Sequence, residues 1–167
     1  MIDPARLSAH FDAHAAALVL YARQIVAEPA AAEDVVHDAF VGLMTLAGPE
    51  PHDPRAWLFR AVRNAAIGRK RSWWRRARRD RAASAARPEM FDARVDDLID
   101  AKDAQTALAA LPAEQREVVV LRIWGGMGFA EIAELVRASV STVHDRYKSA
   151  LAEMKRNLEA TRCQTNR

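Results

Sequence analysis

The stretch FAEIAELVRASVSTVHDRYK, residues 129–148, decides the fold of the C-terminal part of this chain. Its first eight residues carry apolar side chains at helical spacing, which predicts a short helix over 129–136. Arg137 and Ala138 form the turn. Ser139 is suited to cap a second helix, because its hydroxyl can accept a hydrogen bond from a free backbone amide. Two helices joined by so short a turn predict a helix-turn-helix.

The second helix of this motif is predicted to have an apolar face and a polar face. The apolar face advances at steps of three and four residues and consists of Val140, Val143, Tyr147, Leu151, Met154 and Leu158. The polar side chains at the start of such a helix can reach base edges and phosphates in a major groove. The residues that we predict to contact DNA here are Arg137, Ser139, Ser141, Thr142, His144, Asp145, Arg146 and Lys148. A plain helical hairpin is the alternative interpretation of this spacing.

Upstream of the motif the pattern stays helical. Helices are predicted over 95–110 and 112–124, before a glycine-rich break at 125–128. Further towards the N-terminus, apolar residues at helical spacing predict helices over about 7–25 and 31–46. No segment alternates in the manner of a strand, so the expected fold class is all-α.

A third N-terminal helix is predicted to begin after the proline-containing segment 48–54. Asp53 can cap this helix, and Pro54 fits its first position because the missing amide proton has no partner there. The helix then continues into an arginine-rich run that Trp73 and Trp74 interrupt.

The chain is expected to form two small helical domains. With 167 residues, of which 50% are apolar, it can bury one medium core or two small ones. Between residues 81 and 94 the sequence loses its periodicity, which is typical of a linker. We therefore predict a domain at 1–80, a flexible linker at 81–95 and a second domain at 96–167.

Charge is distributed unevenly along the chain. Ten Lys and Arg residues and one acid lie between Arg60 and Arg81, a local balance of +9 that leaves −6 for the rest of a chain of net charge +3. Between Gln24 and Pro54 there are six acids and no Lys or Arg. This pattern indicates one surface for a polyanion and another for a different partner, the alternative being two solvated helix faces.

Several classes of protein are disfavoured by the composition. Cys163 is the single cysteine, so neither a disulfide framework nor a thiolate cluster is expected. The longest apolar runs are far shorter than the roughly 18 to 20 residues of a membrane span. The N-terminus does not read as a signal peptide. We expect a cytoplasmic protein that does not bind a membrane.

Catalysis and metal binding are also disfavoured. His10 and His14 lie four residues apart on one predicted helix, and His37 with Asp38 could add ligands, so a metal site is conceivable. However, His14 falls on the apolar stripe, and the chain has no glycine-rich phosphate loop or serine elbow. We expect a protein that is not an enzyme and that needs no cofactor and no metal.

Three groups of residues also resemble one known family. The segments LPAEQREVVVLR (111–122), FAEIA (129–133) and SVSTV (139–143) look like the fourth conserved region of bacterial sigma factors. The segment AEDVVHDAF (32–40) resembles the core-polymerase-binding helix of the second region, and PRAWLFRAVRN (54–64) resembles the helix that melts and reads the minus-ten element. Their order, with a short linker and no third domain, is similar to the extracytoplasmic-function (ECF) group of the sigma-70 family.

The resemblance implies a role in transcription initiation. A sigma factor binds core RNA polymerase and directs promoter-specific initiation by recognising and melting promoter DNA, both as duplex and as the single-stranded non-template strand. The N-terminal domain would then act at the minus-ten element and the helix-turn-helix at the minus-35 element. The resemblance leaves open whether an anti-sigma factor is a further partner.

The resemblance also implies two sets of site residues in the N-terminal domain. Those implied to bind core polymerase are Glu33, Asp34, His37, Asp38 and Phe40. Those implied to recognise and melt the minus-ten element are Arg60, Arg63, Asn64, Arg69, Lys70, Arg71, Trp73, Trp74, Arg75 and Arg76.

The resemblance further implies that an extruded base lies between the loop at 48–55 and Asn64, whose amide can donate to and accept from a base edge. Asn64 has a simpler interpretation as a solvated helix residue. Trp73 and Trp74 can either stack on bases or pack against the adjacent helix.

The chain departs from the family pattern at several positions. Relatives often carry an acid where this chain has Gly68, a glycine where it has Arg137, and a lysine-serine pair where it has His144 and Asp145. The promoter sequence therefore does not follow from the resemblance. A dimeric helix-turn-helix regulator is the competing hypothesis, but it gives no role to the arginine run or to the acidic helix.

Overall fold

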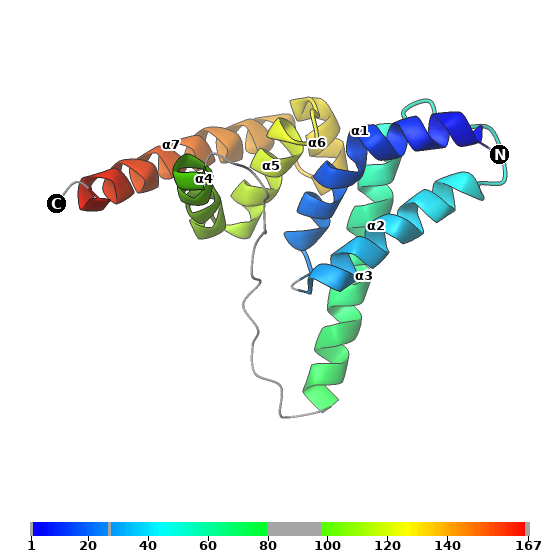
Figure 1. Ribbon diagram of the computed structural model, residues 1–167, viewed down its shortest axis with the longest axis horizontal. Helices are drawn as coiled ribbons and strands as arrows, with labels where there is room; N and C mark the ends of the chain where they lie inside the picture. Colours follow the sequence, from blue (N-terminus) through cyan, green and yellow to red (C-terminus); the bar gives the residue numbers. More distant parts are fainter. Residues whose placement is uncertain (1, 27, 80–97, 166–167) are drawn as a thin grey trace. The chain divides into compact units, whose positions relative to one another are not determined.

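The computed structural model describes residues 2–26, 28–79 and 98–165, which are helical apart from short connections (Figure 1). The helices in these ranges are α1 (Pro4–Arg23), α2 (Pro29–Met44), α3 (Pro54–Arg79), α4 (Leu98–Ala110), α5 (Ala113–Ile123), α6 (Phe129–Val136) and α7 (Val140–Thr165). The all-α prediction is confirmed for this part of the chain. The predicted linker at 81–95 lies outside the described residues.

The chain divides into two compact units, an N-terminal unit (Met1–Glu89) and a C-terminal unit (Met90–Arg167). None of the helices in the described ranges is both long and apolar enough to cross a membrane.

In the N-terminal unit α1, α2 and α3 pack against one another in all three pairs. Leu18, Val35 and Leu58, one from each helix, are completely buried. The rings of Tyr21 and Phe59 meet in the same core, with centroids 5.6 Å apart. Burial of these large apolar side chains supplies the main favourable free energy for the unit.

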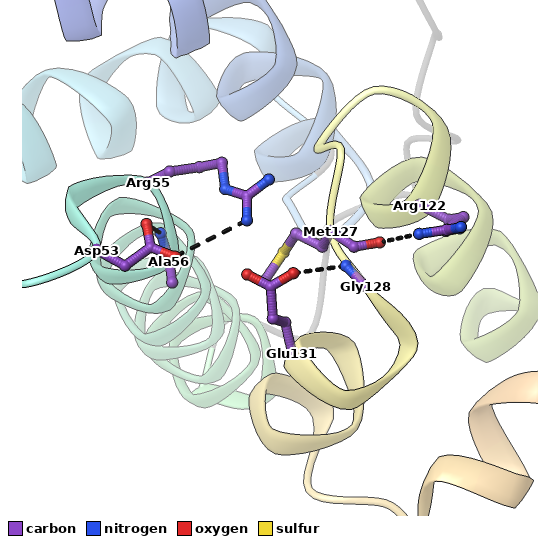
Figure 2. A network of polar contacts seen from close by, with 7 residues as sticks. All are labelled: Asp53, Arg55, Ala56, Arg122, Met127, Gly128 and Glu131. Atoms are coloured by element: carbon purple, nitrogen blue, oxygen red, sulfur yellow. Dashed lines mark hydrogen bonds and ion pairs between the residues drawn. The ribbon is translucent and has the colours of Figure 1, made fainter.

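Two caps fix the starts of helices in this unit. Asp3 Oδ1 accepts a hydrogen bond from the Ala5 amide at 3.3 Å, ahead of Pro4 in α1. Asp53 Oδ1 accepts from the Ala56 amide at 3.0 Å, which confirms the predicted cap of α3 (Figure 2). Such side chains satisfy amides that have no partner within the helix.

In the C-terminal unit α4, α5 and α6 all pack on α7. Leu121, Ile132 and Val143 are completely buried, one each from α5, α6 and α7. The glycine-rich break between α5 and α6 is a sharp bend: Gly126 has φ 61°, and a Cβ added at Gly125 would lie 2.6 Å from Leu121 O. This bend requires glycine at both positions.

Two polar contacts hold the bend, and both are drawn in Figure 2. Arg122 Nη1 donates to Met127 O at 2.8 Å, and the Gly128 amide donates to Glu131 Oε2 at 2.6 Å. The Arg122 guanidinium also lies over the Phe129 ring, 4.8 Å from its centroid. The start of α6 is therefore fixed relative to the end of α5.

The apolar face of α7 differs from the prediction. Val143 and Ala150 are fully buried, but Val140 is 50% exposed and Leu151 is 42% exposed. The prediction that Val140 and Leu151 are buried was wrong. A residue at helical spacing is buried only where another element covers it, and α4, α5 and α6 cover only part of this face.

Candidate nucleic-acid interfaces

One face of α3 carries an exposed stripe that we call the α3 stripe. It consists of Arg60, Asn64, Gly68, Arg71 and Arg75, all exposed and spaced three or four residues apart. This spacing places their side chains on one face of a helix, opposite the buried face. A Cβ at Gly68 would meet no heavy atom within 4 Å. The stripe therefore joins three arginines and an asparagine without an acid among them.

The end of α3 presents both tryptophans to solvent. Trp73 is 46% exposed and Trp74 is 55% exposed, and their rings meet edge to face with centroids 5.3 Å apart. Lys70 is exposed and Arg63 is half-buried. The side chain of Arg76 lies outside the described residues. Each indole ring is thus partly accessible to a flat ligand such as a base.

Arg69 differs from the other arginines of α3, because its side chain turns to α2. Its Nη1 lies 3.1 Å from Asp34 Oδ2 and its Nη2 lies 3.2 Å from Asp38 Oδ2. The hydrogen bond to Asp34, followed by that to Asp38, raises the pKa of Arg69 above its ordinary value. Arg69, which was predicted to contact DNA, is not part of the α3 stripe.

The residues predicted to bind polymerase fall into two groups on α2. Glu33, Asp34, His37 and Asp38 are exposed. Phe40 is buried and packs against Phe11 of α1, with ring centroids 5.0 Å apart. Phe40 therefore belongs to the core in this structure, whereas the four polar residues form a surface.

The loop between α2 and α3 carries contacts that the sequence did not indicate. Arg6 Nη1 of α1 lies 2.7 Å from Glu50 Oε2, and His10 Nε2 lies 3.5 Å from Glu50 Oε1. At the other end of the loop, Arg55 Nη2 lies 3.8 Å from Asp53 Oδ2 (Figure 2). No local motif relates Glu50 to α1, because the two lie far apart in the sequence.

The paired histidines of α1 are stacked, with ring centroids 6.0 Å apart and planes 20° apart. The pKa of His14 lies below its ordinary value, mainly because burial disfavours the imidazolium and then because His10 and Arg55 are nearby, while Asp53 opposes the shift. Within the described residues, no group of three or more His, Cys, Asp or Glu side chains is arranged to hold a metal ion.

In the C-terminal unit, Ser139 caps α7 as predicted. Its Oγ accepts a hydrogen bond from the Thr142 amide at 3.1 Å. The same Oγ lies 2.9 Å from Ser141 Oγ and 2.7 Å from Thr142 Oγ1. The three hydroxyls are exposed and form one cluster at the start of the helix.

Other predicted DNA contacts surround this cluster. His144, Asp145 and Lys148 are exposed, and the His144 ring meets Phe129 edge to face, with centroids 5.3 Å apart. Arg137 ends α6 in the left-handed conformation, φ 57° and ψ 50°. That conformation explains why glycine suits this position, since an L side chain there costs roughly 1 to 2 kcal/mol.

Arg146 is half-buried and its guanidinium is held by α5. Its Nη2 forms an ion pair with Glu114 Oε2. No local pattern of residues predicts this contact, which joins two helices of the unit. Ile123 and Trp124, at the end of α5, are about half exposed and were also not anticipated.

Residues 10–79 match the family model for sigma-70 region 2, and residues 101–154 match that for sigma-70 region 4. The ECF RNA polymerase sigma factor SigL of Mycobacterium tuberculosis is 30% identical over 165 residues, which cover 94% of this chain and 91% of that protein. The RNA polymerase sigma-E factor of Streptomyces coelicolor is 28% identical, over 86% of this chain and 81% of its own.

Two solved structures are also similar to this chain. CnrH, determined in complex with the cytosolic domain of CnrY, is 26% identical with a TM-score of 0.64, over 95% of this chain and 90% of its own. The sigma factor RpoE in complex with the anti-sigma factor NepR, from Bartonella quintana, shares the fold with a TM-score of 0.75 at 22% identity, over 92% of this chain and 97% of its own.

Proposed function

Because the chain belongs to the sigma-70 family, in its extracytoplasmic-function group, we propose that its two helical units carry out separate parts of transcription initiation. The chain is a sigma factor, which directs promoter-specific initiation by core RNA polymerase. Residues 1–80 act as region 2, residues 96–167 act as region 4, and residues 81–95 link them. The factor works in the cytoplasm and leaves the chemistry of RNA synthesis to the polymerase.

The acidic face of α2 is the surface that we propose for core polymerase. Glu33, Asp34, His37 and Asp38 are exposed there, and an acidic face on an apolar-backed helix is suited to a basic groove. Phe40 contributes indirectly, by packing on Phe11 and holding the helix in place.

Charge reversal tests this surface. The double variant Asp34→Lys and Asp38→Lys is expected to co-purify with core polymerase at least about tenfold less than wild type. Asp12→Lys, at an exposed acid of α1, is the control and should co-purify normally. Normal co-purification of the double variant would remove α2 from the interface.

The α3 stripe and the exposed tryptophans carry the proposal for promoter melting. The stripe supplies the attraction to phosphates that every DNA strand offers. Opening the duplex costs a few kcal/mol per unstacked step, and stacking on an aromatic side chain returns about 1 to 3 kcal/mol per base. Trp73 and Trp74 are exposed at the end of the same helix. The residues that would attract the strand therefore lie next to those that would stack on its bases. Asn64, within the stripe, is the amide that would contact an extruded base.

The start of α7 is the surface that we propose for the minus-35 element. Ser141, Thr142, His144 and Asp145 are exposed there, and side chains of these types can donate to and accept from base edges in a major groove. Arg137, Ser139 and Lys148 are placed for phosphates. Arg146 is paired with Glu114, so its guanidinium must break that ion pair before it can contact a base.

Transcription with purified components tests the function as a whole. Core polymerase with this chain is expected to start transcripts at a defined set of promoters from a genomic library, whereas core polymerase alone should start without that selectivity. Sequencing the transcript ends identifies the promoters. A chain that shifts duplex DNA by itself and adds no selective initiation to core polymerase would instead be a dimeric regulator.

An anti-sigma factor is a second partner that we propose. The support is two proteins similar to this chain: RpoE, whose structure was determined with the anti-sigma factor NepR, and CnrH, whose structure was determined with the cytosolic domain of CnrY. Purification of the chain from its native host should then yield a second protein in equal amount, whose addition prevents assembly with core polymerase.

A further inference from the structure

Arg69 joins α3 to the acidic face of α2 through two ion pairs. Its Nη1 lies 3.1 Å from Asp34 Oδ2, and its Nη2 lies 3.2 Å from Asp38 Oδ2. Asp34 and Asp38 are four residues apart, so their side chains lie next to each other on one face of the helix. A single guanidinium therefore bridges both carboxylates.

The two carboxylates remain accessible although Arg69 holds them. The side chain of Asp34 is 66% exposed and that of Asp38 is 63% exposed, whereas the side chain of Arg69 is 39% exposed. Both hydrogen bonds reach the Oδ2 atom of the acid. A cation from another molecule can therefore approach the same two acids, but it meets the guanidinium of Arg69 beside them.

Arg69 also cancels part of the negative charge of this face. The hydrogen bond to Asp34, followed by that to Asp38, raises the pKa of Arg69, so the guanidinium stays protonated. Asp34, Asp38 and Arg69 together thus carry one net negative charge instead of two. Because α2 itself contains no Lys or Arg, this opposing charge comes from a different helix.

We propose that Arg69 attenuates the binding of core polymerase: a basic partner must share Asp34 and Asp38 with Arg69, which weakens the attraction of the acidic face. The inference rests on the proposed role of this face as the polymerase surface. Placing a partner's cation beside Arg69 brings like charges together, and such contacts lower affinity and slow association. A partner with one cation gains little at this face, whereas a groove with several cations still binds.

The test measures the affinity of the complete chain for purified core polymerase in the absence of DNA. Arg69→Gln removes the guanidinium and leaves both acids in place. It is expected to bind core polymerase about threefold to tenfold more tightly than wild type, because two exposed ion pairs no longer compete with the partner. The gain should lie mainly in faster association, and it should shrink at high salt, which screens exposed charges.

Arg6→Gln is the matched control. It removes one positive charge and one ion pair from the same unit, but the partner of Arg6 is Glu50, which does not belong to α2. Its affinity for core polymerase should equal that of wild type. A gain as large as that of Arg69→Gln would show that the total charge of the unit matters and that Arg69 has no special role.

A double-mutant cycle separates attenuation from a change in stability. In the background of Asp34→Asn with Asp38→Asn, Arg69→Gln should bring no further gain in affinity, because no carboxylates remain to be shared. Thermal unfolding should show that Arg69→Gln is no more stable than wild type, since it only loses contacts. A gain that persists in the double-Asn background would overturn the proposal.

The same variants distinguish failure of this inference from failure of the proposed surface. If Asp34→Asn with Asp38→Asn binds core polymerase as wild type does, the acidic face of α2 is not the polymerase surface, and both proposals are wrong. If that variant binds more weakly while Arg69→Gln binds equally or more weakly than wild type, the surface is correct. Arg69 would then be neutral or would orient the acids, and the inference would be wrong.

Discussion

The N-terminal and C-terminal units offer different chemistry to DNA. The α3 stripe presents guanidinium groups and ends at two exposed tryptophans, whereas the start of α7 presents a cluster of hydroxyls and an imidazole. Guanidinium groups attract any phosphate, and indole rings stack on any base, so the first surface favours strands of any sequence. Hydroxyl and imidazole groups depend on the pattern of a base edge, so the second surface favours selectivity.

The two units share one feature that limits their positive charge. In each unit, an arginine that was predicted to contact DNA is held by acids of a neighbouring helix. Arg69 pairs with Asp34 and Asp38, and Arg146 pairs with Glu114. A count of basic residues in the sequence therefore overstates the charge that either unit presents to DNA.

The largest effect is expected at the tryptophans, and it would separate single-stranded from duplex DNA. Replacing both Trp73 and Trp74 by Ala should weaken binding of the polymerase complex to the single-stranded non-template strand by about 1 to 3 kcal/mol for each base that is stacked. Binding to the duplex minus-35 element should be unchanged. Fluorescence anisotropy with the two DNA forms measures both. Equal losses of affinity for both DNA forms would show that the tryptophans do not favour single-stranded over duplex DNA.

The next effect concerns the salt dependence of binding. Arg71→Gln with Arg75→Gln should reduce the slope of log affinity against log salt by about two, one for each lost phosphate contact. Arg69→Gln removes one positive charge from the same helix, but from a side chain that faces Asp34 and Asp38, so its slope should change by clearly less than the one expected for a lost phosphate contact. Titrations of promoter binding at several salt concentrations provide the slopes. A full slope after loss of Arg71 and Arg75 would place the phosphate contacts elsewhere.

A smaller effect is expected from the pair in the C-terminal unit. Glu114→Gln should release Arg146 and increase affinity for the upstream element, whereas Arg146→Ala should lower discrimination at particular base pairs by about 1 to 3 kcal/mol if that side chain reads a base. Stability should change little, because exposed ion pairs contribute about 0 to 1 kcal/mol. Selection from a randomised DNA pool compares the motifs. Unchanged motifs with uniformly lower affinity would reduce Arg146 to a phosphate contact.

The smallest effect is a pH dependence of stability in the N-terminal unit. The folded state lowers the pKa of His14, so the unfolded chain takes up a proton first as the pH falls. His14 therefore contributes stability above about pH 6.5, and that contribution is lost progressively below it. Thermal unfolding between pH 8 and pH 5 should fall more steeply for wild type than for His14→Gln. Parallel profiles for the two proteins would show that His14 is not responsible.

Local structure was predictable from the sequence because its causes lie within a few residues. Helical spacing and short turns predicted the helices from α1 to α7, and residues 95–97 of the predicted fourth helix lie outside the described residues. The caps Asp53 and Ser139 were identified correctly because a cap bonds an amide two or three positions away. The helix-turn-helix followed from the same local rules.

Contacts between helices were decided only by the tertiary structure. Nothing near Glu50 in the sequence points to Arg6, and nothing near Arg146 points to Glu114. The same holds for Phe40, which packs on Phe11 within the core, and for Val140, which has the spacing of a buried residue yet is half exposed. Which side chains are covered, and which charges are paired, depends on the elements that fold against them, and that arrangement is not a property of any local stretch of sequence.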